Sequence, residues 1–181
     1  MDEYPSWNEK IEVKTWHRGA EGLVALRDFE ILDARGKRLG AVSSHWFLLD
    51  PETRKAVEPE INDNATSSVW PVAVMKEQPS RIFIPNDLPL IRSVTAGYTD
   101  LDMYLHVNNA RYIEWVLNLF PEDMHHKFSI SSFLIEFLSE VKYAEEIRLF
   151  ASVNPEESLV KGIRSGDGKT IFKARVNWKM R

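Results

Sequence analysis

The chain has 181 residues, 44% of them hydrophobic, and its 23 Lys and Arg against 27 Asp and Glu give a formal net charge of −4. This size suits one large domain or two small ones with a sizeable core. The excess of acidic residues argues against non-specific electrostatic binding of nucleic acid. The absence of cysteine excludes disulfides, thiolate metal sites and a cysteine nucleophile. No run approaches the roughly 18 apolar residues of a membrane span, and residues 1–7 lack the regions of a signal peptide. We therefore expect a cytoplasmic protein without a membrane span.

The first part of the chain is predicted to be a three-stranded antiparallel meander. Apolar and polar residues alternate over 9–16, 22–32 and 38–49, which is typical of strands with one buried face. Gly36, between the second and third strands, supplies the positive φ that a tight hairpin needs. No helix is expected in this part of the chain.

Residues 58–89 show neither the alternation of a strand nor the periodicity of a helix in their hydrophobic residues. Five prolines and a polar run over 62–68 interrupt this stretch. We expect a linker over 59–89 with one short helix near Val72–Gln78. A connection of about 30 residues is long for one compact unit, so the linker is predicted to join two units.

The second unit is predicted to contain one long helix and an antiparallel sheet. A strand is expected over 90–98, and an apolar stripe at steps of three and four residues predicts a helix over His106–Phe120, ended by Pro121. Four further strands are expected after the helix. A single helix wrapped by a curved antiparallel sheet belongs to the α+β class. The four predicted strands are 129–142, 144–153, 158–165 and 169–179.

The densest cluster of functional groups lies at 99–112, where the predicted helix begins. Unpaired N–H groups and the helix dipole at this end can hold an anion or polarise a carbonyl. A carboxylate or imidazole beside them could activate a water or attack directly. A structural alternative is open, in which Asp102 or Asn108 only caps the helix and His106 is a hydrogen-bonded structural histidine.

The string over 100–115, Asp-Leu-Asp-Met-Tyr-Leu-His-Val-Asn-Asn-Ala-Arg-Tyr-Ile-Glu-Trp, resembles the signature of acyl-acyl-carrier-protein thioesterases. The segments 15–19, 26–31 and 43–50 resemble that family in the same order. The resemblance implies tandem hotdog domains, each a long helix cradled by an antiparallel sheet. It also implies hydrolysis of the thioester between a fatty acyl chain and the carrier protein's phosphopantetheine arm, in fatty-acid biosynthesis. It calls for no metal and no cofactor.

The family's functional residues carry over one by one, with two departures. Asp102 and His106 stand at the family's Asp and His positions, and Glu140 matches its carboxylate on the strand after the helix. Tyr104 stands where Asn is usual, and Val141 where plant members often have Cys. The bulky phenol could narrow the site, replace the amide, or mark a chain that has lost activity.

The expected mechanism is hydrolysis assisted by a carboxylate. Glu140 would activate water as general base, His106 would orient the water or shuttle a proton, and Asp102 would hold the loop and bias His106. Backbone N–H groups at the start of the helix would polarise the thioester carbonyl. The predicted substrate-binding residues there are Val107, Asn108 and Asn109.

Two other functions remain open: a hotdog hydrolase that acts on acyl-coenzyme A, and a non-catalytic hotdog protein that binds acyl chains or assembles with partners. The expected domains are a partial first hotdog over 1–58, the linker over 59–89, and a complete second hotdog over 90–181 with the catalytic site. The first hotdog's helix and opening strand have no room before Thr15. We therefore expect a truncated chain, a fragment, or a homo-oligomer whose subunits cover one another.

Overall fold

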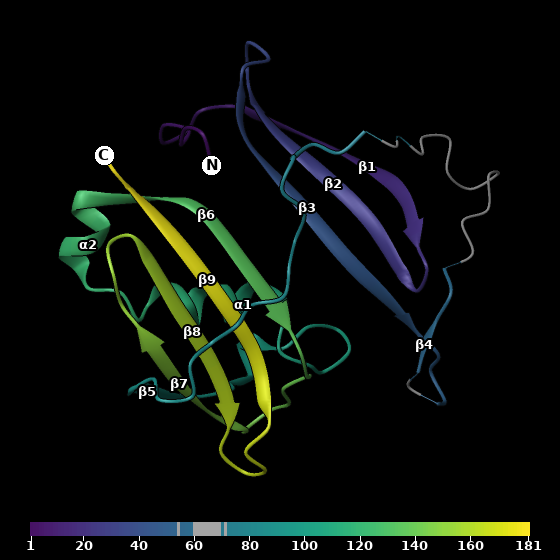
Figure 1. Cartoon of the computed structure of the whole chain (residues 1–181), viewed down its shortest axis with the longest axis vertical. Coiled ribbons are helices and arrows are strands. Elements are labelled where there is room, and N and C mark those ends of the chain that lie inside the picture. Colours follow the sequence, from purple (N-terminus) through teal and green to yellow (C-terminus); the bar gives the residue numbers. More distant parts are fainter. Residues whose placement is uncertain (54, 60–69, 71) are drawn as a thin grey trace. The chain divides into compact units, whose positions relative to one another are not determined.

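A computed structural model of the chain describes residues 1–53, 55–59, 70 and 72–181. The chain divides into two compact units, Met1–Ser80 and Arg81–Arg181, drawn from purple to teal and from teal to yellow in Figure 1. The division falls inside the expected linker, of which residues 60–69 and 71 lie outside the described residues. The domain boundaries expected from the sequence stay a prediction.

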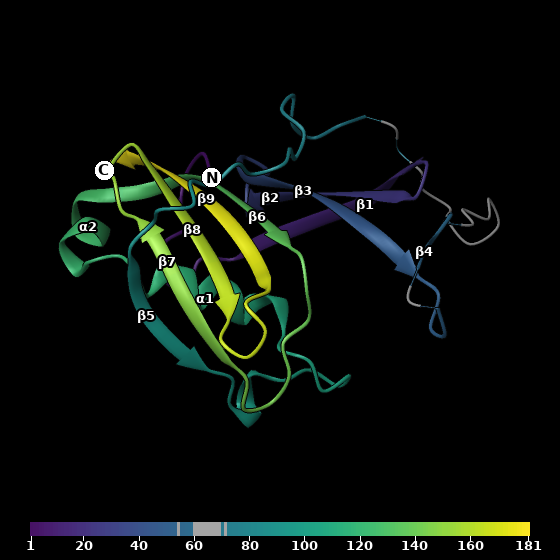
Figure 2. The same cartoon turned by 60° about the horizontal axis from the view of Figure 1, so that its bottom comes forward.

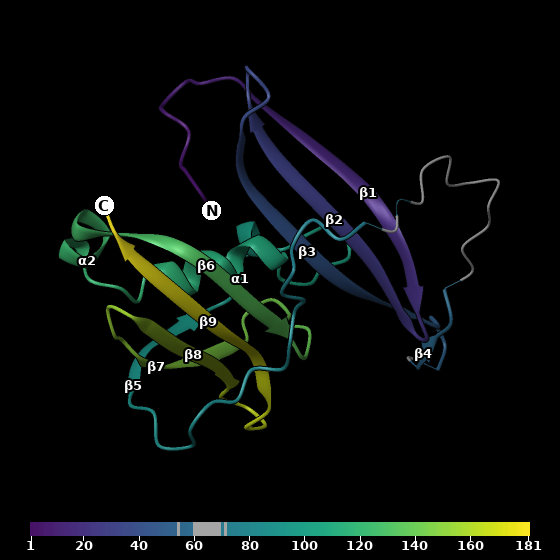
Figure 3. The same cartoon turned by 45° about the horizontal axis from the view of Figure 1, so that its top comes forward.

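The first unit is an antiparallel sheet in the order β1-β2-β3-β4. Its three long strands twist together as a meander (Figure 3), as the alternating pattern predicts. Gly36 has a φ of +81° in the turn between β2 and β3, where the Asp33 carboxylate accepts hydrogen bonds from two backbone N–H groups of the turn. The strands are β1 (Ile11–Glu21), β2 (Val24–Asp33), β3 (Arg38–Leu49) and β4 (Ala56–Val57).

The short helix expected near Val72–Gln78 is wrong, because none of these residues is helical. Side chains of the first sheet take up the polar groups of this segment instead. The N–H of Val74 donates to the carboxylate of Asp28 at 2.8 Å, and the Trp16 indole donates to the Val72 carbonyl at 3.3 Å. These bonds to the sheet replace the i to i−4 bonds that a helix would need.

The second unit is a five-stranded antiparallel sheet in the order β5-β7-β8-β9-β6, with α1 against one face (Figures 1 and 2). This arrangement confirms the predicted α+β class. None of the described helices is long and apolar enough to cross a membrane. The elements are β5 (Leu90–Thr95), the 3-10 helix η1 (Tyr98–Asp100), α1 (Asn109–Leu117), α2 (Glu122–Lys127), β6 (Phe128–Phe137), β7 (Glu146–Ser152), β8 (Glu157–Arg164) and β9 (Thr170–Met180).

The core of the second unit lies between α1 and the sheet. Val116 of α1 and Phe172 of β9 are fully buried, and full burial of such side chains contributes about 1.5–3 kcal/mol each. Gly162 of β8 makes room for Phe172, since a Cβ at this position would lie 2.3 Å from the phenyl ring. The Tyr112 ring packs edge-on against Phe172, with ring centroids 5.5 Å apart. This packing fixes α1, and the loop before it, on the sheet.

The helix is shorter than the apolar stripe predicts. Instead of His106–Phe120 it spans Asn109–Leu117, because Asn108 has extended backbone angles and caps it. His106 belongs to a β-bridge with Lys142 rather than to the helix. The short helix α2, with acidic residues in its first turn and basic residues in its last, was not predicted.

Candidate active site

The segment before α1 is a tight, pinned turn. One carboxylate oxygen of Asp102 accepts from the N–H groups of Tyr104 at 2.8 Å and His106 at 3.3 Å. The Asp102 N–H donates to the His106 carbonyl at 2.8 Å. Leu105, with a φ of +62°, occupies the left-handed region that non-glycine residues rarely adopt. Asp102 is thus bonded to the backbone of the turn, as expected for a residue that holds the loop.

A second loop, residues 138–145 between β6 and β7, brings Glu140 to this turn. The predicted strand 129–142 ends at Phe137, so the expectation that Glu140 lies on a strand is wrong. Val107 donates its N–H to the Val141 carbonyl at 2.8 Å, and His106 forms a bridge with Lys142. These backbone contacts join the two loops side by side.

The two loops place an imidazole beside a carboxylate. His106 Nε2 lies 3.4 Å from Glu140 Oε2, and the two side chains are 27% and 45% exposed. Water can therefore reach both groups. An imidazole and a carboxylate at this separation can share a proton, or orient a water that lies beside them.

The backbone donors at the start of α1 differ from those expected. The N–H groups of Val107 and Asn108 already donate to the carbonyls of Val141 and Asp100, each at 2.8 Å. These two N–H groups are therefore already engaged within the chain, and their role as donors to a substrate carbonyl stays a prediction. The Asn108 side chain accepts from the Ala110 N–H at 2.9 Å and so caps α1. Within the described residues the N–H of Asn109, first in α1, has no acceptor.

Tyr104 does not fill the space between the imidazole and the carboxylate. Its side chain is 73% exposed, and the flanking Met103 and Leu105 are also exposed. In the part of the chain that the structure describes, its hydroxyl has no hydrogen-bond partner. The phenol therefore does not take the place of an amide in contact with His106 or Glu140.

Tyr112 and Arg164 surround the site from the core side. The pKa of Tyr112 is raised to about 12, because the effect of burial outweighs the opposite effect of a hydrogen bond with the Val141 backbone. Arg164 Nη2 donates to the Glu140 carbonyl at 2.7 Å. Sequence reasoning missed Arg164, because its only local signal is its position just before the hairpin turn over 165–168.

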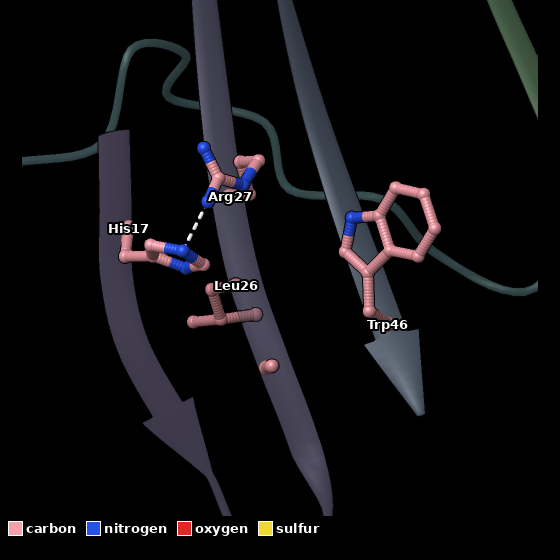
Figure 4. A pocket seen from close by; sticks show the side chains of 5 residues that line it. His17, Leu26, Arg27 and Trp46 are labelled. Carbon is pink, nitrogen blue, oxygen red and sulfur yellow. Dashed lines mark hydrogen bonds between the residues drawn. The ribbon is translucent and has the colours of Figure 1, made fainter. Parts of the chain in front are cut away.

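The first unit contains a separate hollow of about 280 Å³ on its sheet, lined by His17, Ala25, Leu26, Arg27 and Trp46 (Figure 4). The His17 imidazole and the Arg27 guanidinium are hydrogen-bonded there. Burial, and then the charge of Arg27, lower the pKa of His17. The described residues that line the hollow include no carboxylate, so they do not form an acid–base pair like that of His106 and Glu140.

Known proteins resemble the chain along its whole length. Residues 87–180 match the acyl-ACP thioesterase C-terminal domain, and residues 1–66 match the acyl-ACP thioesterase N-terminal domain. An acyl-[acyl-carrier-protein] hydrolase of Cuphea viscosissima is 29% identical over 195 residues, covering 99% of this chain and 46% of the relative. The dodecanoyl-[acyl-carrier-protein] hydrolase of Umbellularia californica is 28% identical over 194 residues, covering 99% of this chain and 50% of the relative. The chain thus spans about half the length of these curated relatives.

The fold has a close counterpart among solved structures. The acyl-ACP thioesterase of Bacteroides thetaiotaomicron superposes with a TM-score of 0.85 at 28% identity, covering 94% of this chain and 69% of that one. This likeness confirms the hotdog fold expected from the sequence. With both domain matches in order along the sequence, the chain belongs to the acyl-ACP thioesterase family.

Proposed function

We propose that the chain is a thioester hydrolase that releases fatty acids from acyl-acyl-carrier protein. The observation that carries this proposal is the 3.4 Å pair of His106 and Glu140 beside the start of α1. Relatives named as acyl-[acyl-carrier-protein] hydrolases, similar along nearly all of this chain, support it. The pair supplies the general base that thioester hydrolysis needs.

In the proposed reaction, Glu140 takes a proton from a water whose oxygen attacks the thioester carbonyl carbon. The resulting tetrahedral intermediate expels the sulfur, which leaves as a thiol after it takes up a proton. The products are a free fatty acid and the thiol of the phosphopantetheine arm. His106 orients the water or passes the proton to the leaving sulfur, since its Nε2 lies beside the carboxylate.

The carbonyl oxygen gains negative charge during this attack and needs a donor. We assign that role to the N–H of Asn109, which has no acceptor among the described residues, in place of Val107 and Asn108. The N-terminal dipole of α1 adds to its effect. Asp102 keeps the turn in shape through its bonds to Tyr104 and His106.

The partner in this proposal is an acyl-carrier protein that carries a fatty acyl-phosphopantetheine, in fatty-acid biosynthesis. We propose a cytoplasmic location, whereas the two plant relatives are named chloroplastic. We also propose a homo-oligomer, which the exposed apolar side chains on the first sheet support. These exposed side chains include Val13, Val42 and Trp46.

The direct test is release of free thiol from acyl-acyl-carrier protein and from acyl-coenzyme A across a range of chain lengths. Glu140→Ala is expected to abolish release while its circular dichroism and unfolding midpoint stay close to those of the wild type. Glu156→Ala, at an exposed carboxylate before β8, is the matched control and should keep full turnover. Retained turnover in Glu140→Ala contradicts the mechanism, and faster release from acyl-coenzyme A contradicts the proposed substrate.

Tyr104 provides a second test, of whether the chain is active as it stands. The exposed phenol leaves the His106–Glu140 pair open, so the wild-type chain is expected to turn over. No release from either substrate by the wild type, with turnover in Tyr104→Asn, would instead indicate an enzyme that has lost its activity.

A further inference from the structure

Arg164 is the last residue of β8, and its guanidinium reaches the loop that carries Glu140. Its Nη2 donates to the main-chain carbonyl of Glu140 at 2.7 Å and lies 3.4 Å from Ser139 Oγ. Its Nη1 lies 3.4 Å from a carboxylate oxygen of Glu145, at the other end of the loop, and 3.4 Å from one of Asp167. One side chain thus connects the start, the middle and the end of the loop over 138–145.

The surroundings of Arg164 make these bonds strong. The side chain is only 19% exposed, and Arg164 pairs across the sheet with Ile147, which is fully buried. A charged hydrogen bond to a carbonyl is stronger than a neutral one, and partial burial limits competition from water. The planar guanidinium can also serve several acceptors at once, which a lysine ammonium on a flexible stem does less well.

The Glu140 peptide is held from two directions. Its own carbonyl accepts from Arg164, and the next carbonyl, that of Val141, accepts from the Val107 N–H at 2.8 Å. At its ends the loop is tied by the Leu138 N–H to the Ile171 carbonyl at 2.8 Å and by the Ala144 N–H to the Ala96 carbonyl at 2.9 Å. Of these four ties only the bond from Arg164 comes from a side chain, so it can be removed by substitution without changing the backbone.

We propose that Arg164 is a positioning residue that fixes the backbone of Glu140 and thereby keeps its carboxylate beside His106. The inference rests on the proposed function for its effect on turnover. Arg164 is bonded to the main chain of Glu140 and acts through that residue, so we do not count it as a catalytic residue. Displacement of a reacting group by about 1 Å can cost about 10²-fold in rate.

The kinetic test compares Arg164→Gln, Arg164→Lys and the matched control Arg175→Gln. Arg175 also lies on a strand of this sheet, but its guanidinium is 3.9 Å from Glu157 and makes no bond to the loop over 138–145 among the described residues. Arg164→Gln is expected to lower kcat about 10- to 100-fold with little change in KM, because the substrate groups are still bound. Arg164→Lys should recover part of kcat, and Arg175→Gln should equal the wild type. An unchanged kcat in Arg164→Gln overturns the proposal, and so does an equal loss in the control.

Hydrogen–deuterium exchange tests the same inference without any substrate. Arg164→Gln should speed amide exchange in peptides that cover 138–145 while peptides of α1 and the unfolding midpoint change little. Unchanged exchange in the loop, or faster exchange throughout the unit, overturns the positioning role. If the wild type hydrolyses no thioester, the proposed function fails, and the exchange result still decides whether Arg164 holds the loop.

Discussion

His106 Nε2 and Glu140 Oε2 lie 3.4 Å apart in the second unit, although one residue precedes α1 and the other follows β6. The contact depends on backbone pairing, since His106 forms a β-bridge with Lys142 and Val107 is bonded to Val141. The two side chains are thus placed by main-chain contacts at His106 and at the residues that follow His106 and Glu140. Whether the two side chains act together as a pair can therefore be tested.

The first prediction is that the effects of His106→Asn and Glu140→Gln on turnover are not additive. General acid–base groups contribute about 10²- to 10⁴-fold each, and residues that act as a unit lose most of this with the first substitution. The double variant should therefore be little slower than the slower single variant, as measured by kcat for thiol release. Losses that multiply in the double variant would show that the two residues act independently.

The second prediction asks whether Asp102 acts through the hydrogen bonds that its side chain accepts or through its negative charge. Asp102→Asn keeps an oxygen that can accept from the N–H groups of Tyr104 and His106, whereas Asp102→Ala removes it. We expect Asp102→Ala to lower the free energy of unfolding by about 1 kcal/mol and Asp102→Asn to leave it nearly unchanged, in urea titrations. If Asp102→Asn then keeps its turnover, the charge is not required; equal destabilisation by both substitutions would contradict the assigned bonds.

The strands of the first unit could be predicted from sequence because their signal is local. Alternation and the turn around Gly36 are encoded within a few residues, and β3 has the predicted bounds Arg38–Leu49. The bounds of the helix could not be predicted from sequence, because backbone hydrogen bonds to other parts of the chain compete with the hydrogen bonds of the helix. The Val107 N–H is bonded to Val141, and at the other end the N–H groups of Leu119 and Phe120 are bonded to carbonyls three residues back. The apolar stripe therefore runs past both ends of the α-helix.

The candidate site could be predicted only in part. The functional groups at 99–112 are adjacent in sequence, so their clustering was visible, and the family resemblance pointed to Glu140. The spacing of residues in the sequence cannot reveal which backbone N–H groups remain unbonded. The Val107 N–H is bonded to the carbonyl of Val141, which is distant in sequence, and the Asn108 N–H is bonded to the carbonyl of Asp100, before the helix. Arg164 was missed for the same reason, because its bond to Glu140 joins the end of β8 to a loop that is distant from it in sequence.

The third prediction concerns the loss of folding stability at high pH that the ionisation of Tyr112 causes. The pKa is raised to about 12 in the folded chain and is about 10 in an unfolded chain, so the folded state binds the proton more tightly. The resulting stabilisation is fully present below pH 10 and is lost as the pH rises from 10 towards 12. Urea unfolding from pH 9 to 11.5 should show a smaller loss of stability in Tyr112→Phe than in the wild type. Tyr143→Phe, at an exposed phenol, should follow the wild type, and identical slopes in all three proteins would contradict the shift.

The fourth prediction uses the backbone of Leu105, whose φ of +62° suits asparagine or glycine better than leucine. Its side chain is exposed, so Leu105→Asn loses little packing. We expect the free energy of unfolding to rise by up to about 1 kcal/mol, measured by chemical denaturation. Met103→Asn, on the same turn and also exposed, should have no such effect. A loss of stability in Leu105→Asn would mean that the leucine side chain makes contacts that outweigh the backbone strain.

The last prediction concerns the buried ion pair of the first sheet, Arg18 and Asp28. Asp28 is fully buried, and its carboxylate lies 3.3 Å from Arg18 Nε while it accepts from Ser43 at 2.7 Å and from the Val74 N–H at 2.8 Å. Arg18→Ala leaves this carboxylate without its counter-charge, which typically costs about 3–5 kcal/mol. The exposed Lys37–Glu3 pair gives the matched control, because solvent screens it.

We therefore expect chemical denaturation to show a large drop in midpoint for Arg18→Ala and almost none for Lys37→Ala. The bond from the Val74 N–H to Asp28 ties the non-helical segment over 72–78 to the sheet, so the same variant should also speed amide exchange over 72–78. If Arg18→Ala is as stable as Lys37→Ala, the two neutral donors alone suffice to hold the buried carboxylate. Faster exchange over 72–78 without loss of stability would instead assign the pair to anchoring that segment rather than to the sheet.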